Sequence, residues 1–234
     1  MNMIFNGMDL TQYFRIKDIR RDLLPPLTSV AQAIPGRPGS IIGSTGISDR
    51  MMEVDIRIKV NKRPELREKA RELAGLLYTE DYEKLTFSDE PDKYYMAKID
   101  GNTDIAEKAI YGDVTLPFLY DPLAYGETKS LDISGSLQNG GTRATTGIIT
   151  VTLGAVDHLK MTLKSTGEYV YIKHPFTTSD TVTIDLSEGT AYKNGVSITQ
   201  DVYLESDFFD IPVGTFEISL SSGTGSIEFT ERWL

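Results

Sequence analysis

The chain has 234 residues, a formal net charge of −10 and no cysteine. The lack of cysteine excludes disulfides, thiolate metal ligands and cysteine nucleophiles, and an acidic chain repels phosphate backbones, so we expect no nucleic acid partner. No run of eighteen apolar residues is present, and the first ten residues carry Asp9 but no basic residue. We therefore expect no transmembrane helix, no signal peptide and no membrane partner.

Charge is distributed unevenly along the chain. Residues 1–125 contain 17 Lys and Arg and 20 Asp and Glu, whereas residues 126–234 contain 7 and 14 and are rich in Thr, Ser and Gly. This shift predicts two domains with different roles. We place the boundary between Leu123 and Ser130, after the strand-breaking pair Asp121-Pro122.

The first half predicts strands arranged around one helix. A strand is expected near residues 13–19, and apolar residues alternate with charged ones over residues 53–60, which indicates a strand with one buried face. The period then changes, because five apolar residues share one helical face: Leu66, Ala70, Leu73, Ala74 and Leu77. This pattern predicts a helix over about residues 62–78, with Asn61 as N-cap and Pro64 in the first turn.

Three more strands complete the first half. Two short strands are expected at residues 84–87 and 94–99, and alternation predicts a last strand over residues 114–120. We interpret residues 1–125 as an α+β domain, a β-sandwich with one helix and an extended arm.

The arm, residues 24–48, fits neither period. It contains four prolines and four glycines together with large apolar residues, and a loop of this length is uncommon in a compact domain unless it functions or is disordered. We interpret it as an extended arm that packs on another subunit or forms a long hairpin. The alternative is a surface loop folded back on its own domain.

Residues 126–234 are expected to form an all-β domain. Short alternating runs recur at a spacing of about ten residues, at 151–153, 159–163, 182–186, 216–220 and 227–229. Asn194-Gly195 is a strong hairpin signal, because a type I′ turn needs positive φ at both central residues. This pattern predicts a β-sandwich, so the whole chain is expected to be mainly β.

Catalytic and cofactor-binding motifs are not evident. His158 and His174 lack the spacing of metal ligands and are interpreted as structural residues. The glycine-rich residues 36–46 lack the Lys-Ser/Thr that ends a P-loop. Asp89 and Asp92 flank a proline turn, which explains them locally. We therefore expect no enzymatic activity, no metal and no cofactor.

Five short motifs follow one another over the first 125 residues: Phe5-Asn6-Gly7, Pro35-Gly36-Arg37-Pro38-Gly39, Asp49-Arg50, residues 85–95 (LTFSDEPDKYY) and residues 116–125 (LPFLYDPLAY). In order and spacing they resemble the distal tail protein family of siphophages. The second half resembles more loosely that family's galectin-like C-terminal sandwich, through Asn194-Gly195, Ser206-Asp207-Phe208 and Arg232-Trp233-Leu234. Its Pro212-Val213-Gly214-Thr215 segment departs from the family's P-G-x-N run.

The resemblance implies a structural role at the tail tip of the virion, after production in the host cytoplasm. Members of the family form a hexameric ring from their N-terminal domains, and their C-terminal domains project outward. The ring joins the tail tube protein and the tape measure protein to the tail-associated tip protein, and in many phages it anchors receptor-binding proteins. The family has no catalytic residues.

A closed ring needs one patch on each subunit to meet a different patch on the next, and an extended arm suits that task. At this interface we expect Ile34, Ile41, Ile42 and Ile47 as anchors and Arg37 as a hydrogen-bond donor. The expected function is thus a structural hub.

The alternative function is a carbohydrate-binding module or adhesin that contacts host cell-surface glycans. It depends on Tyr169, Tyr171 and Tyr192, which could stack on a sugar ring; their other interpretation is as core and edge residues.

Overall fold

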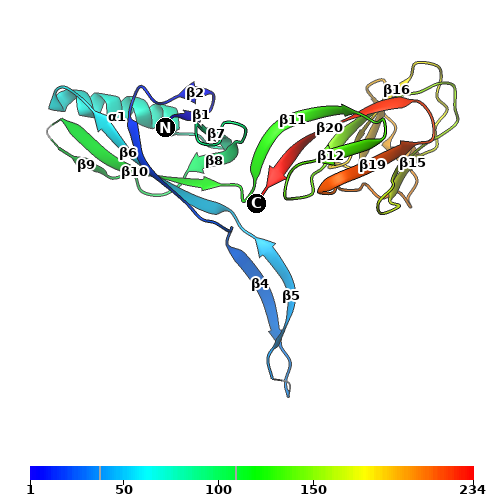
Figure 1. Cartoon of the computed structure of the whole chain (residues 1–234), viewed down its shortest axis with the longest axis horizontal. Coiled ribbons are helices and arrows are strands. Elements are labelled where there is room, and N and C mark those ends of the chain that lie inside the picture. The colour runs from blue at the N-terminus through cyan, green and yellow to red at the C-terminus, as the bar shows by residue number, and fades with distance from the viewer. Residues whose placement is uncertain (37, 109) are drawn as a thin grey trace. The chain divides into compact units, whose positions relative to one another are not determined.

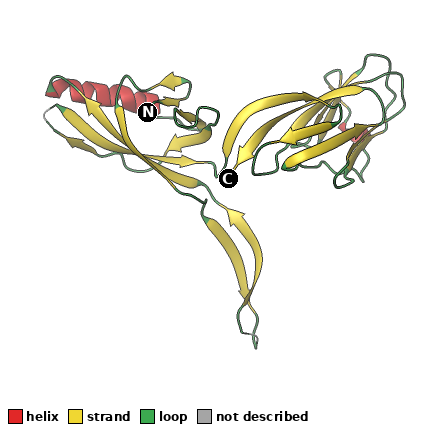
Figure 2. Ribbon diagram, viewed as in Figure 1, coloured by secondary structure: helices red, strands yellow, loops and turns green. Residues whose placement is uncertain are grey.

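The structure is a computed structural model that describes residues 1–36, 38–108 and 110–234, with the backbone alone for residues 44, 45 and 63. The chain divides into two compact units, Met1–Ala124 with Leu234, and Tyr125–Trp233. Strands dominate both units (Figure 2), so the mainly β architecture predicted from the sequence is confirmed. No helix among the described residues is long and apolar enough to span a membrane.

The first unit is built on one large antiparallel sheet. Across the described sheet the strands follow the order β2 (Met8–Asp9), β1 (Met3–Phe5), β7 (Glu83–Phe87), β8 (Tyr95–Ile99), β10 (Tyr111–Tyr120), β6 (Arg50–Lys59) and β3 (Arg15–Arg21), and β9 (Ile105–Glu107) also pairs with β10. The pair β6–β10 forms the centre of the sheet, in register from Tyr111 opposite Lys59 to Tyr120 opposite Arg50. Alternate residues of β6 are buried, as its sequence predicts.

This sheet curls over itself and thereby encloses a core. Two strands separate β1 from β10, which would place them about 14 Å apart in a flat sheet. The rings of Phe5 on β1 and Phe118 on β10 nevertheless pack edge to face, with centroids 5.6 Å apart. A single curled sheet therefore forms both facing layers around the core, where the sequence predicted a β-sandwich.

One α-helix, α1 (Arg63–Leu77), packs on β6 and β10 through its buried residues Leu66, Leu73 and Leu77. The predicted N-cap, Asn61, is wrong by one residue, because the cap is Lys62. Lysine has no hydrogen-bond acceptor in its side chain. The Glu65 carboxylate instead accepts hydrogen bonds from the backbone N–H groups of Asn61 and Lys62, at 3.1 and 3.3 Å.

Between β3 and β6 the chain forms a separate hairpin (Figure 1), in which β4 (Leu27–Ala33) pairs antiparallel with β5 (Ser40–Ile47). Every residue of β4 is exposed, so this segment is a long hairpin rather than a loop folded back on its own unit. We call residues 24–48 the arm.

The second unit is a sandwich of two antiparallel sheets. One sheet has the order β11 (Ala124–Asp132), β20 (Thr224–Trp233), β13 (Gly147–Thr152), β16 (Thr181–Asp185), β17 (Thr190–Lys193) and β18 (Val196–Ser197). The other has the order β12 (Ser136–Asn139), β19 (Gly214–Leu220), β14 (Leu159–Leu163) and β15 (Tyr169–Ile172). One core joins them, with Ile149 and Ile184 from the first sheet and Met161 and Phe216 from the second.

Asn-Gly turns close two of the hairpins. Asn194 and Gly195, with φ of 47° and 82°, connect β17 to β18 as predicted. Asn6 and Gly7, with φ of 47° and 74°, connect β1 to β2 in the same way.

Candidate assembly interface: the arm and its neck

The arm is an apolar structure that its own unit leaves exposed. Residues 24–48 contain a single charged residue, Arg37. The exposed fractions of Leu27, Val30 and Ile42 are 58%, 62% and 64%. Soluble proteins rarely expose contiguous apolar surface of this kind unless a partner covers it.

Neither strand of the hairpin joins a larger sheet. Over the described residues, β4 and β5 pair only with each other, so no further strand covers the outer edge of either one. Natural edge strands are usually blunted by charges, above all lysine. These two strands carry no charged residue, which favours pairing with another chain.

The cross-strand register distributes the apolar side chains over both faces of the arm. Ala31 lies opposite Ile42, and these two residues share one face. Ile41 lies opposite Gln32 and therefore occupies the other face.

Of the predicted interface residues, Ile42 thus lies on one face of the arm and Ile41 on the other, and Ile47 lies opposite Leu27, beyond a shift in the register. Ile34 follows β4 and is 40% exposed. Arg37 lies outside the described residues.

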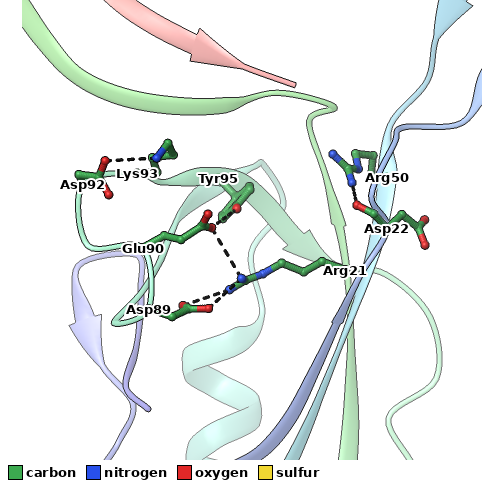
Figure 3. Close-up of polar contacts among 8 residues, drawn as sticks. All are labelled: Arg21, Asp22, Arg50, Asp89, Glu90, Asp92, Lys93 and Tyr95. Carbon is green, nitrogen blue, oxygen red and sulfur yellow. Dashed lines mark hydrogen bonds and ion pairs between the residues drawn. The ribbon is translucent and has the colours of Figure 1, made fainter. Parts of the chain in front are cut away.

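Arg21, the last residue of β3, ties the entry of the arm to the turn between β7 and β8 (Figure 3). Its guanidinium donates two hydrogen bonds to Asp89, at 2.9 and 3.3 Å, and lies 3.6 Å from the Glu90 carboxylate. It also lies over the ring of Phe87, 4.7 Å from the centroid. The Tyr95 hydroxyl donates to the same Glu90 carboxylate at 2.6 Å. Four side chains thereby hold Arg21 in place.

Arg50, the first residue of β6, ties the exit of the arm to its entry. This buried arginine donates a hydrogen bond to the backbone carbonyl of Asp22 (Figure 3) and lies over the ring of Tyr120, 5.4 Å from the centroid. Beside it, the Tyr82 hydroxyl donates to Asp49 at 2.9 Å. We call Arg21, Asp22, Asp49 and Arg50 the neck of the arm.

Arg21 and the two tyrosines beside the neck have raised pKa values. Burial alone lowers the pKa of Arg21, but the hydrogen bonds and charge of Asp89 outweigh burial and raise that pKa above its usual value. Burial and the hydrogen bond to Glu90 raise the pKa of Tyr95. Burial and the hydrogen bond to Asp49 raise the pKa of Tyr82 to about 12. Arg21 therefore stays charged, and Tyr82 and Tyr95 stay neutral, at neutral pH.

Sequence reasoning missed this neck. It explained Asp89 as a local turn residue, whereas the structure shows that Asp89 also binds Arg21, 68 positions away in the chain. The neck positions Asp49 and Arg50 did belong to one of the motifs, but the motif alone did not reveal their partners.

The structure does not bring the three candidate glycan-contact tyrosines together. Tyr169 and Tyr171 alternate with buried residues of β15 and face outward from the four-stranded sheet. Tyr192 follows buried Ala191 on β17 and faces outward from the six-stranded sheet. Outward faces of the two sheets of a sandwich point in opposite directions, so one platform cannot contain all three residues.

The two histidines have local partners. His158 lies 2.6 Å from Asp157 and stacks on Tyr171, and His174 lies 2.7 Å from Asp201. Over the part of the chain that the structure describes, no group of three His, Asp or Glu side chains could hold a metal ion.

Two family models match the chain. The phage tail protein RIFT-related domain matches residues 8–120, and the siphovirus-type tail component C-terminal domain matches residues 140–233. The distal tail protein of Bacillus phage SPP1 is 28% identical over 241 aligned positions, which cover 99% of this chain and 95% of that protein. The chain belongs to the distal tail protein family of siphophages. It is therefore a component of a phage tail, and the family resemblance of its sequence is confirmed.

Solved structures agree with this family. The crystal structure of the SPP1 distal tail protein, described as a paradigm of hub adsorption apparatus in Gram-positive infecting phages, has a TM-score of 0.87 and 25% identity. That match covers 100% of this chain and 99% of the other. A chain of the phage P2 baseplate in its activated conformation with Ca has a TM-score of 0.47 and 9% identity over 98% of this chain and 97% of the other, values too low to support an argument.

Proposed function

We propose that this distal tail protein is the structural hub of the tail tip. In this proposal six copies form a ring that joins the tail tube protein and the tape measure protein to the tail-associated tip protein, and it provides a base for receptor-binding proteins. The protein acts through binding alone, without catalysis or a cofactor. It is made in the host cytoplasm and resides in the virion.

The observation that carries the proposal is the arm. An exposed, nearly uncharged hairpin whose strands join no larger sheet over the described residues is costly for an isolated protein, because it invites uncontrolled pairing. The cost is removed if a neighbouring subunit covers the hairpin in the assembled state. Its length of about 25 residues matches one side of a standard protein interface, which contains about 20–30 residues.

The neck supports the same function. Arg21 and Arg50 fix both ends of the arm to the sheet, so less conformational freedom is lost when a neighbour binds it. A contact from the arm of one copy to a different surface of the next is heterologous, and such contacts close into rings when the rotation permits. The similarity to the SPP1 protein over the full chain supports a hub in particular.

Localisation in the particle tests this proposal. Gold-labelled antibodies against the second unit should decorate the tip end of the tail in electron micrographs of the phage that encodes this chain. Labelling along the whole tube, or at the head-proximal end, would contradict a hub at the tip.

Carbohydrate binding by the second unit is a second proposal, with one observation in its favour. Tyr171 faces outward and is flanked by His158 and Tyr203, with ring centroids 5.5 and 5.0 Å away. Binding to cell-wall glycans that is lost in Tyr171→Ala and kept in Tyr192→Ala would support it. Equal binding by both variants would exclude a platform at Tyr171.

A further inference from the structure

An apolar groove lies at the C-terminal half of α1, on the first unit. Its walls are formed by Leu73, Ala74, Leu77 and Tyr78 on the helix side and by Ile99 and Ile105 on the sheet side, and its volume is about 280 Å³. None of the residues that the structure places around it is charged. A groove without charge is unusual for this part of the chain, because residues 1–125 include 37 charged residues. We call this feature the α1 groove.

The α1 groove is open to a partner. Ala74 and Tyr78 at its mouth are exposed, and the exposed fraction of Tyr78 is 75%. Thr79 also lines the groove, and its hydroxyl oxygen is buried.

The arm of the same copy does not fill the groove. Every residue of β4 is exposed, which excludes burial of that strand in any groove of its own chain. The distal part of β5 is exposed as well, with Ile41 and Ile42 47% and 64% exposed.

We propose that the α1 groove of one copy receives Ile42, at the distal end of the arm of a second copy. The Ile42 side chain is 64% exposed and lies at the end of the hairpin away from the neck. The strands β4 and β5 and the lining of the groove carry no charged residue, so no charge of these surfaces loses its water when they meet. This proposal rests on the ring proposed above and names the two surfaces that form each joint.

The absence of cysteine makes disulfide trapping a clean test. One chain carries Ile42→Cys and the other carries Ala74→Cys. The two are mixed, allowed to assemble and oxidised. Because each chain has a single cysteine, a mixed disulfide can form only between copies. We expect a product of twice the chain mass that contains both chains.

A matched control uses Glu72→Cys in place of Ala74→Cys. Glu72 is exposed on the same helix but is not among the groove residues, and it points about 160° away from Ala74. We expect at least tenfold less mixed disulfide with this variant. Equal trapping at both positions, or none at Ala74 while the native mass shows a ring, would overturn the groove proposal and leave the ring intact. A protein that neither assembles nor crosslinks would overturn both.

A second variant tests the groove without oxidation. Ala74→Trp places a large side chain at the groove mouth, where it should leave the thermal unfolding of the single chain unchanged because Ala74 is exposed. We expect the concentration needed for assembly to rise at least tenfold, whereas Glu72→Trp should leave it within twofold. An unchanged assembly concentration in Ala74→Trp would contradict docking at this groove.

Discussion

Ile42→Ser separates folding from assembly more clearly than any other single change in the arm. Ile42 is 64% exposed in the isolated chain, so its replacement removes little buried contact, and we expect the free energy of unfolding to change by less than about 0.5 kcal/mol. In the proposed ring a neighbouring copy covers the same side chain. Full burial of an isoleucine is worth about 1.5–3 kcal/mol, so burial of the exposed two thirds contributes about 1–2 kcal/mol to each joint.

The proposed ring has six joints, so the effect on assembly is amplified. A loss of about 1–2 kcal/mol in each joint raises the midpoint concentration for six copies by a factor of roughly 8 to 60. Sedimentation velocity over a concentration series measures this midpoint, and chemical denaturation at low concentration measures the stability of the single chain.

The control for this experiment is Val196→Ser. Val196 on β18 is 69% exposed and belongs to the second unit, outside the arm. It should change neither measurement. A midpoint for Ile42→Ser that equals the wild-type value, or a loss of chain stability above 1 kcal/mol, would refute the reasoning.

Three more predictions concern the stability of the single chain. Arg21→Met removes the tie to Asp89, a partly exposed pair, and should lower the free energy of unfolding of the first unit by about 1–2 kcal/mol in urea titrations. Hydrogen bonds from Thr177, Lys193 and Asn194 hold the pKa of Asp180 well below 3.8. The ionised Asp180 carboxylate therefore makes its full contribution to stability above pH 3.8, and this contribution is lost as the pH falls below that value. Acid titration followed by circular dichroism should show a smaller loss of stability in Asp180→Asn than in the wild type. Gly195→Ala should cost about 1–2 kcal/mol in thermal unfolding, because its φ of 82° disfavours any side chain.

Controls for Arg21→Met and Gly195→Ala come from the same chain. Arg67→Met breaks an ion pair with Glu107 but involves a side chain that is 68% exposed, so it should have less effect than Arg21→Met. Gly154→Ala adds a Cβ with no atom within 4 Å and no positive φ, so it should cost less than Gly195→Ala. A larger effect in either control would contradict the structural explanation of its partner.

Alternation and turn chemistry revealed much of the fold from the sequence, because both are local. The buried and charged positions of β6 follow directly from its sequence. The hairpin at Asn194-Gly195 was found in the same way. The equivalent turn at Asn6-Gly7 was not interpreted as a type I′ turn, although its two residues carried the same signal.

The features that sequence reasoning missed depend on contacts between distant positions. Nothing local links Arg21 to Asp89, and only the paired strands place them together. The three tyrosines were grouped by residue type, but the faces on which they lie follow from the sheet to which each strand belongs. The arm was identified by composition, since 25 residues with a single charge are unusual in a half so rich in charge.

The most direct test of the hub account compares the native mass of the wild-type chain with that of a chain whose arm is shortened. Residues 28–46 are replaced by Asn-Gly, a turn that the chain already uses between β17 and β18. The account predicts a wild-type ring of six 26.0 kDa chains, about 156 kDa, and a shortened chain that keeps the mass of its own monomer over the same concentrations. A wild-type chain that remains a monomer at every concentration, or a shortened chain that still forms the ring, would contradict it.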